Sequence, residues 1–229
     1  MLIAAGVALA LVAQGSAPQR DKPPLALLTS LPLLFGEGFS IDAEKSAAAT
    51  RLEAKYRLVP IGVADAASLK GQRLLLMAHP RAQPAEVLVE LDQWVRDGGR
   101  VVVLADPRLD WDSERPLGDR LRPPPYFADT GLLLHWGVRL DGPSAEGPQA
   151  RRGGVREVLT SSRGVLTRET QACAVDAGGF VATCRVGRGE AIVIADADFL
   201  NVAGSGAIDG PTAHNLDLLV DQLARAESR

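Results

Sequence analysis

The 229-residue chain has few aromatic residues and no excess of positive charge. Phe, Trp and Tyr make up only 4% of it, so its core must be built from Leu, Val, Ile and Ala. That composition suits helices packed on a buried sheet. The formal net charge is −3, which argues against the concentrated basic face that nucleic-acid binding requires. We therefore expect one α/β domain that binds no nucleic acid.

The chain also lacks an apolar run of the roughly 20 residues that a membrane-spanning helix requires. The uncharged run Met1–Ala13 has the length of the hydrophobic region of a signal peptide, although no Lys or Arg precedes it. We expect residues 1–15 to be a signal peptide or membrane anchor and residues 16–24 to be a linker. Residues 25–229 then form a single domain. The alternative is that the run is the first buried strand or helix of that domain.

Only two cysteines occur, Cys173 and Cys184. Between them Gly178-Gly179 is typical of a two-residue hairpin turn, and this turn places the cysteines opposite each other on neighbouring strands. Opposed strand positions are compatible with a disulfide, and disulfides persist in exported proteins. The alternative is a pair of buried thiols in a cytosolic core. Together with the N-terminal run, the spacing favours a disulfide and a periplasmic or otherwise extracytoplasmic location.

A strand, a helix and a second strand are predicted in the middle of the chain. Residues 73–78 and 100–105 are continuous apolar runs, as expected for strands covered on both faces. Residues 84–97 carry apolar side chains at helical spacing and end at Gly98-Gly99. Short connections between these elements indicate parallel strands with a right-handed crossover.

The last third of the chain changes character. Residues 155–186 contain short β-branched runs and turn signals, which predict an antiparallel hairpin extension of the sheet. A further buried strand at 190–195 and an amphipathic helix at 212–226 follow. The predicted fold is α/β, with a mostly parallel sheet flanked by helices. Weaker signals predict helices over 42–56 and 126–136.

Polar residues follow three of the predicted strands, where open α/β sheets bind their ligands. Because the carboxyl ends of neighbouring parallel strands share one edge, we expect these residues to line a common site. The candidate ligand-binding or partner-binding residues are His79, Asp106, Asp196, Asp198, Asn201, His214 and Asn215.

Motifs for catalysis, metal binding and cofactor binding are missing or weak. No Gly-x-Ser-x-Gly or Gly-x-Cys-x-Gly elbow supplies an activated nucleophile, so we expect no catalytic residue. The Asp196-x-Asp198 pair, with His79 and His214, has ligand chemistry, but aspartates after a strand more often cap turns. The glycine pairs do not lie between a strand and a helix, which argues against a phosphate cradle. We therefore expect neither a metal nor a cofactor.

Three stretches together resemble one protein family. They are 74–107, with LDQWVRDGGR leading to VVVLADP, then 130–140 (TGLLLHWGVRL), and 192–223, with IVIADADFLN leading to HNLDLLVDQL. The pattern is similar to the extracytoplasmic domain of gliding-motility-type ABC-transporter auxiliary proteins. The resemblance implies a flavodoxin-like fold of the class I glutamine amidotransferase type that lacks the amidotransferase nucleophile.

The resemblance also implies a function and partners. It suggests a non-catalytic binding domain, membrane-associated through its N-terminus, that serves the permease and ATPase subunits of an ABC-type transport system. The alternative from the residues is a divergent hydrolase that uses Asp106, Asp196 or His79 as acid or base. A cytosolic scaffold without a ligand is the third interpretation.

Overall fold

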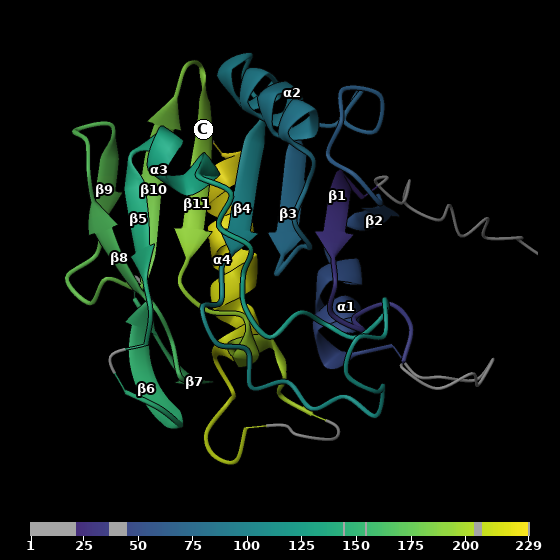
Figure 1. The fold of residues 1–229 in the computed structure, drawn as a ribbon, viewed down its shortest axis with the longest axis vertical. Coiled ribbons are helices and arrows are strands. Elements are labelled where there is room, and N and C mark those ends of the chain that lie inside the picture. Colours follow the sequence, from purple (N-terminus) through teal and green to yellow (C-terminus); the bar gives the residue numbers. More distant parts are fainter. Residues whose placement is uncertain (1–21, 37–44, 144, 154, 204–207, 229) are drawn as a thin grey trace, which may run out of the picture.

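The computed structural model describes residues 22–36, 45–143, 145–153, 155–203 and 208–228, and its centre is a seven-stranded sheet (Figure 1). In spatial order the strands are β2 (Arg57–Pro60), β1 (Pro24–Thr29), β3 (Leu74–Ala78), β4 (Arg100–Leu104), β11 (Gly189–Ile194), β10 (Val181–Val186) and β9 (Cys173–Val175). The first five run parallel, whereas β10 is antiparallel to both of its neighbours. The predicted α/β class and mostly parallel sheet are confirmed.

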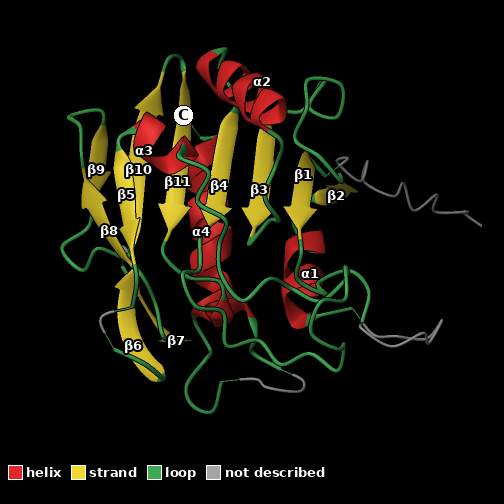
Figure 2. Ribbon diagram, in the orientation of Figure 1, coloured by secondary structure: helices red, strands yellow, loops and turns green. Residues whose placement is uncertain are grey.

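Helices cover both faces of the sheet (Figure 2). Helices α1 (Ala47–Glu53) and α4 (Asn215–Glu227) pack on one face. Helices α2 (Ala85–Arg96) and α3 (Leu132–Trp136) pack on the other. Two smaller antiparallel pairs flank this arrangement. They are β5 (Val138–Asp141) with β8 (Val165–Arg168), and β6 (Pro148–Gly153) with β7 (Arg156–Ser161).

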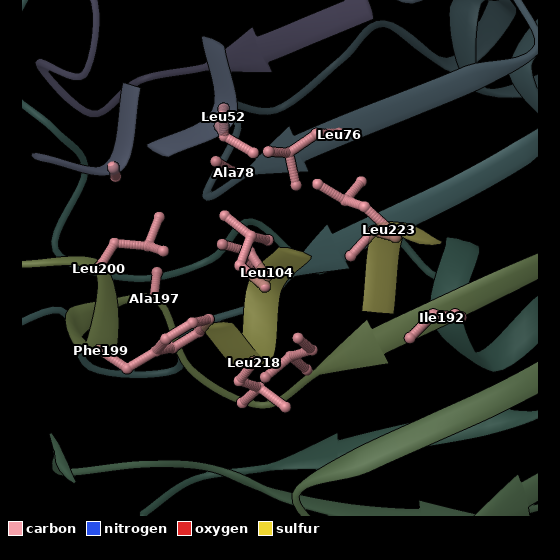
Figure 3. Packing of buried hydrophobic residues seen from close by; sticks show 14 of the residues in the cluster. Leu52, Leu76, Ala78, Leu104, Ile192, Ala197, Phe199, Leu200, Leu218 and Leu223 are labelled. Carbon is pink, nitrogen blue, oxygen red and sulfur yellow. The ribbon is translucent and has the colours of Figure 1, made fainter. Parts of the chain in front are cut away.

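Alternate residues of the central strands supply two separate cores. Leu76, Leu104 and Ile192 point to the face covered by α4, where they meet Leu218 and Leu223 (Figure 3). The intervening strand residues pack against α2 and α3 on the opposite face. Burial of each such leucine contributes about 2 kcal/mol, so both faces of the sheet drive folding.

Two helices are shorter than the sequence patterns predict. Helix α1 begins at Ala47 because the Ser46 hydroxyl caps it by accepting a hydrogen bond from the Ala49 N–H at 3.0 Å. Helix α3 begins only after Gly131, whose φ of 86° lies outside the helical region. The predicted start of the second helix at residue 126 is therefore wrong. The predicted start of the first at residue 42 lies outside the described residues, and the described residues 45 and 46 are not helical.

The predicted signal peptide or anchor at residues 1–15 lies outside the described residues, as does most of the predicted linker at 16–24. Within the part of the chain that the structure covers, no helix has the length and apolar character needed to cross a membrane.

Candidate functional site

The carboxyl ends of β3, β4 and β11 meet at one edge of the sheet (Figure 1). The parallel register pairs Ala78 with Leu104 and Leu104 with Ile194. His79 and Asp106 therefore leave the sheet at the edge where Asp196 also lies. Three of the candidate residues, His79, Asp106 and Asp196, thus lie at this edge. The short 3-10 helix η1 (Asp198–Leu200) brings Asp198 to the same edge.

Three carboxylates form a compact group at this edge. Asp106, Asp196 and Asp198 each contribute one oxygen, and these oxygens all lie within 4.8 Å of one another. The three side chains are buried, with exposed fractions of 0%, 0% and 2%. We call this group the carboxylate cluster. Its donor set, three hard oxygen ligands, is the type that binds Mg²⁺ or Ca²⁺.

Hydrogen bonds from the chain hold the cluster in place. Asp106 accepts from the Arg108 N–H through Oδ1 and from the Ala197 N–H through Oδ2, both at 2.9 Å. The Ala197 contact joins the loop after β4 to the loop after β11. Both oxygens of Asp198 accept from the Asp110 N–H, at 3.1 and 3.0 Å.

Asp196 is held differently from its two neighbours. Its Oδ1 accepts from the Thr160 hydroxyl and, at 3.1 Å, from the Phe199 N–H. Its Oδ2 is buried and has no hydrogen-bond partner among the described residues. Thr160 belongs to β7, far from the aspartates in sequence, and no local signal in the sequence marked it as part of this site.

Burial raises the pKa of every carboxyl in the cluster. Loss of solvent raises the pKa of Asp106 to about 6, although the N–H groups of Ala197 and Arg108 oppose this. Burial and the charge of Asp106 raise the pKa of Asp198 to about 9. Burial, followed by the charges of Asp106 and Asp198, raises the pKa of Asp196 well above its usual range. Three ionised carboxylates therefore cannot share this dry site unless protons or a cation compensate their charge.

His79 lies at the same edge but binds a different part of the chain. Its imidazole is buried, and Nε2 lies 2.8 Å from the Pro124 carbonyl oxygen. The Ser30 hydroxyl donates to the main-chain carbonyl of His79 and does not reach the ring. His79 thus fastens the segment around Pro124 to the end of β3.

The side chains of Asn215 and His214 do not join the carboxylate cluster. Asn215 is buried and bonds to Leu159 and Phe199, so it connects α4 to β7 and η1. The adjacent His214 is 59% exposed and lies 3.9 Å from Asp217. Asn201 is buried beside the cluster, where its N–H donates to the Asp198 carbonyl at 2.8 Å.

Hydroxyl groups near the cluster bond to an aspartate that the sequence did not single out. Ser161 and Ser162 both donate to Asp110 Oδ2, at 2.6 and 2.7 Å. No Ser or Cys side chain hydrogen-bonds to an imidazole within the described ranges. The nucleophile–base pair on which a serine or cysteine hydrolase depends is thus not assembled in these residues.

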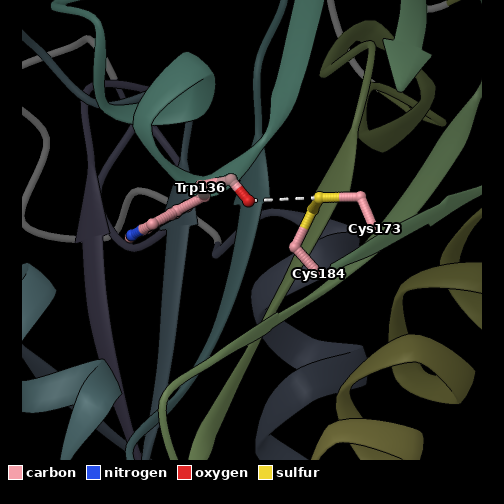
Figure 4. The surroundings of a disulfide bond; sticks show 3 residues. All are labelled: Trp136, Cys173 and Cys184. Carbon is pink, nitrogen blue, oxygen red and sulfur yellow. Dashed lines mark hydrogen bonds between the residues drawn. A yellow bond between two sulfur atoms is a disulfide. The ribbon is translucent and has the colours of Figure 1, made fainter. Parts of the chain in front are cut away.

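The two cysteines lie away from this edge, on β9 and β10. Cys173 faces Cys184 in the antiparallel register, with Val175 opposite Ala182, as the Gly178-Gly179 turn predicts. The two sulfurs form a disulfide, and Cys173 Sγ lies 3.2 Å from the Trp136 carbonyl oxygen (Figure 4).

Residues 108–125, which we call the proline-rich segment, cross the carboxyl edge after β4. Contacts at both ends anchor it: the Leu109 N–H donates to the Pro125 carbonyl at 3.0 Å, and the Phe127 N–H donates to the Asp106 carbonyl at 2.7 Å. Between these anchors, Leu117 is 88% exposed and Leu121 is 64% exposed. Two large apolar side chains of this segment are therefore available to solvent, beside the exposed charged residues Asp112, Glu114 and Arg120, while the carboxylate cluster stays buried.

No protein-family model matches the chain, and no curated protein matches its sequence. Solved structures do match. A cytoplasmic protein from Salmonella typhimurium is 9% identical with a TM-score of 0.53, over 88% of this chain and 98% of its own. A β-galactosidase from Rahnella sp. R3 is 14% identical with a TM-score of 0.51, over 90% of this chain and 31% of its own. An exo-β-1,4-mannosidase from an Opitutaceae bacterium is 11% identical with a TM-score of 0.48, over 92% of this chain and 35% of its own.

The present chain thus spans about a third of the length of the glycosidases that it matches. At identities this low the likeness concerns the fold alone.

Proposed function

We propose that this chain is a non-catalytic binding domain that serves an ABC-type transport system outside the cytoplasm. One observation carries the proposal. The polar groups at the carboxyl edge are buried and largely bonded within the chain, while the proline-rich segment above them exposes Leu117 and Leu121. Exposed apolar side chains are a feature of surfaces that contact another protein.

The transport role rests on the resemblance of three sequence stretches to gliding-motility-type auxiliary domains. In the fold these stretches are β3 to β4, α3 with β5, and β11 to α4. They supply three adjacent central strands and helices on both faces, so the resemblance concerns the centre of the domain. The amidotransferase-like architecture, with β9 and β10 as its hairpin extension, belongs to the same proposal.

The extracytoplasmic location is supported by the disulfide between Cys173 and Cys184, because cytosolic thiols are normally kept reduced. The proposal includes a signal peptide or tether in residues 1–15. Cells that produce the full chain should be quenched with acid, and their thiols should be alkylated before and after reduction. We expect both cysteines to be protected until reductant is added; free thiols without reductant would place the chain in a reducing compartment.

The partner surface can be tested on the proline-rich segment. The triple variant Leu117→Ser, Leu121→Ser, Tyr126→Ser removes three side chains that are at least 64% exposed. We expect co-purification with the permease and ATPase subunits of the proposed transport system to fall at least tenfold. Val89→Ser on α2 is the control, since Val89 is 68% exposed on a different element. Equal retention of both variants would reject this surface.

A divergent hydrolase is the second candidate, because raised carboxyl pKa values such as that of Asp198 are typical of acid–base sites. The burial of the Asp198 carboxyl argues against this role, since a substrate must reach the proton that is transferred. We expect wild type and the Asp196→Asn, Asp198→Asn double variant to hydrolyse generic esters, amides and glycosides at the same background rate. Turnover that depends on Asp196 would favour the hydrolase instead.

A further inference from the structure

We infer that the carboxylate cluster of Asp106, Asp196 and Asp198 is a binding site for a hard divalent cation such as Ca²⁺ or Mg²⁺. This inference does not depend on the proposed transport function. It rests on the arrangement of the three side chains and on one oxygen that the chain leaves unbonded.

The spacing of the cluster suits a single ion. One oxygen from each of the three aspartates lies within 4.8 Å of the others. Oxygens bound to one ion lie at most about twice the metal–oxygen distance apart, roughly 4.8 Å for Ca²⁺ and roughly 4.2 Å for Mg²⁺. The separations in the cluster are therefore compatible with either ion.

The second observation is the unbonded oxygen of Asp196. Five of the six carboxylate oxygens in the cluster accept an N–H or O–H from the chain. The sixth, Asp196 Oδ2, is buried without a partner among the described residues, on a side chain with 0% exposure. A buried carboxylate oxygen without a partner destabilises the folded state, and a directly bound cation removes that cost.

The ligand types indicate the class of metal. The group contains three aspartates and, within the described part of the chain, neither histidine nor cysteine. Carboxylate oxygens favour Ca²⁺, Mg²⁺ or Mn²⁺, whereas Zn²⁺ and Cu²⁺ sites normally include imidazole or thiolate. The two imidazoles that the sequence suggested as ligands lie elsewhere. His79 contacts the Pro124 carbonyl, and His214 lies 3.9 Å from Asp217.

A cation here would join three segments of the chain. Asp106 follows β4, Asp196 follows β11, and Asp198 opens η1. Asp198 also accepts the Asp110 N–H and Asp106 accepts the Arg108 N–H, so hydrogen bonds already join the cluster to the proline-rich segment. Because the cluster is closed to solvent, the ion would stabilise this edge and hold that segment, with no role in turnover.

The test uses the purified full chain, treated with EDTA and exchanged into metal-free buffer. Ca²⁺ alone and Mg²⁺ alone are then added, and binding is followed by calorimetry and thermal melting. We expect one Ca²⁺ per chain and a rise in Tm of about 5–10 °C when Ca²⁺ exceeds its Kd by 100-fold. A rise with Mg²⁺ supports the same site.

The variants Asp196→Asn and Asp198→Asn keep the size of each side chain and remove one ligand charge, so we expect both to lose the Ca²⁺-dependent rise. Asp112→Asn is the matched control, because Asp112 is an exposed carboxylate in the adjacent proline-rich segment. It should respond to Ca²⁺ as wild type does.

Two outcomes would overturn the inference. The first is a wild-type chain that neither binds Ca²⁺ or Mg²⁺ nor changes its Tm in EDTA, with Asp196→Asn more stable than wild type; protons then neutralise the cluster. The second is an unchanged Ca²⁺ response in both Asp196→Asn and Asp198→Asn, which places the ion elsewhere. If Asp196→Asn does not fold, Asp198→Asn and the wild-type stoichiometry decide the question.

Discussion

The Nε2 atom of His79 lies 2.8 Å from the carbonyl oxygen of Pro124, across 45 residues of sequence. A carbonyl oxygen only accepts hydrogen bonds, so Nε2 must carry the proton and neutral Nδ1 must hold the lone pair. That Nδ1 is buried without a partner in the described structure. His79 is thus suited to the neutral form, and in that form it holds the proline-rich segment against β3.

His79 should therefore contribute a loss of stability in mildly acidic solution. The raised pKa values of the carboxylate cluster act in the opposite direction, so the His79 contribution is measured as the difference between wild type and a His79 variant. Burial lowers the pKa of His79 below 6.5, with the charge of Arg81 acting in the same direction. Below pH 6.5 His79 binds a proton in the unfolded chain but not yet in the folded chain. The contribution of His79 to the free energy of unfolding is therefore lost as the pH falls through this window. The slope is up to about 1.4 kcal/mol per pH unit. Denaturant titrations at pH 7.5, 6.5 and 5.5 measure it.

His79→Asn is the comparison for this pH series, because asparagine tolerates the left-handed φ of 47° at this position. Relative to wild type, the variant should gain stability as the pH falls from 6.5 to 5.5, because it lacks the group whose pKa is depressed. Parallel pH profiles for the two proteins would mean that another group is responsible.

Loss of the disulfide should destabilise the chain without changing its fold. Cys173 and Cys184 are 11 residues apart in sequence, and a loop of this size contributes about 3 kcal/mol in the chain-entropy account. The Cys173→Ala, Cys184→Ala variant should lose this amount in urea denaturation. Dithiothreitol should lower the stability of wild type to a similar level and leave the variant unchanged. An equal effect of dithiothreitol on both proteins would contradict this assignment.

Much of the sheet could be predicted because its determinants are local. The apolar runs at 73–78, 100–105 and 190–195 correspond to β3, β4 and β11 to within one residue at each end. The Gly178-Gly179 turn was sufficient to predict the register that sets Cys173 opposite Cys184. In both cases the physical cause lies within a few neighbouring residues, so a local sequence pattern is enough to predict the structure.

The carboxylate cluster could be predicted only in part. Parallel strands that end in aspartates predict a shared edge, and Asp106, Asp196 and Asp198 do meet there. The contributions of Thr160 and Asp110 depend on contacts 36 and 88 residues distant in sequence, which local patterns do not encode. His214 shows the converse, since it adjoins buried Asn215 in sequence yet points to solvent.

Gly189, at the start of β11, should not tolerate a side chain. A Cβ at this position would overlap the carbonyl oxygens of Val95 and Gly99, and backbone atoms cannot turn aside as a side chain can. We expect Gly189→Ala to cost about 3 kcal/mol in the free energy of unfolding. Gly178→Ala is the control, because a Cβ there meets only Asp176 Oδ1 at 3.8 Å. Similar melting temperatures for the two variants would show that β11 and α2 can separate.

Asn215 should be the most sensitive polar residue outside the carboxylate cluster. Its Oδ1 accepts from the Leu159 N–H at 3.0 Å, and its Nδ2 donates to the carbonyls of Leu159 and Phe199 at 2.7 and 2.9 Å. Asn215→Ala leaves three main-chain groups without these partners, one buried at Phe199 and two partly buried at Leu159, and each costs about 1 kcal/mol. We expect a loss of about 3 kcal/mol in urea denaturation.

The neighbouring residue provides the control for Asn215. His214→Ala removes a side chain that is 59% exposed and carries only a long contact to Asp217, so its effect on unfolding should stay within about 0.5 kcal/mol. Because Asn215 joins α4 to β7 and η1, its loss should also speed hydrogen exchange at the Leu159 and Phe199 amides, while the β1 amides keep their protection. If exchange rises equally in β1, the variant has lost global stability and the three bonds do not act as a local clamp.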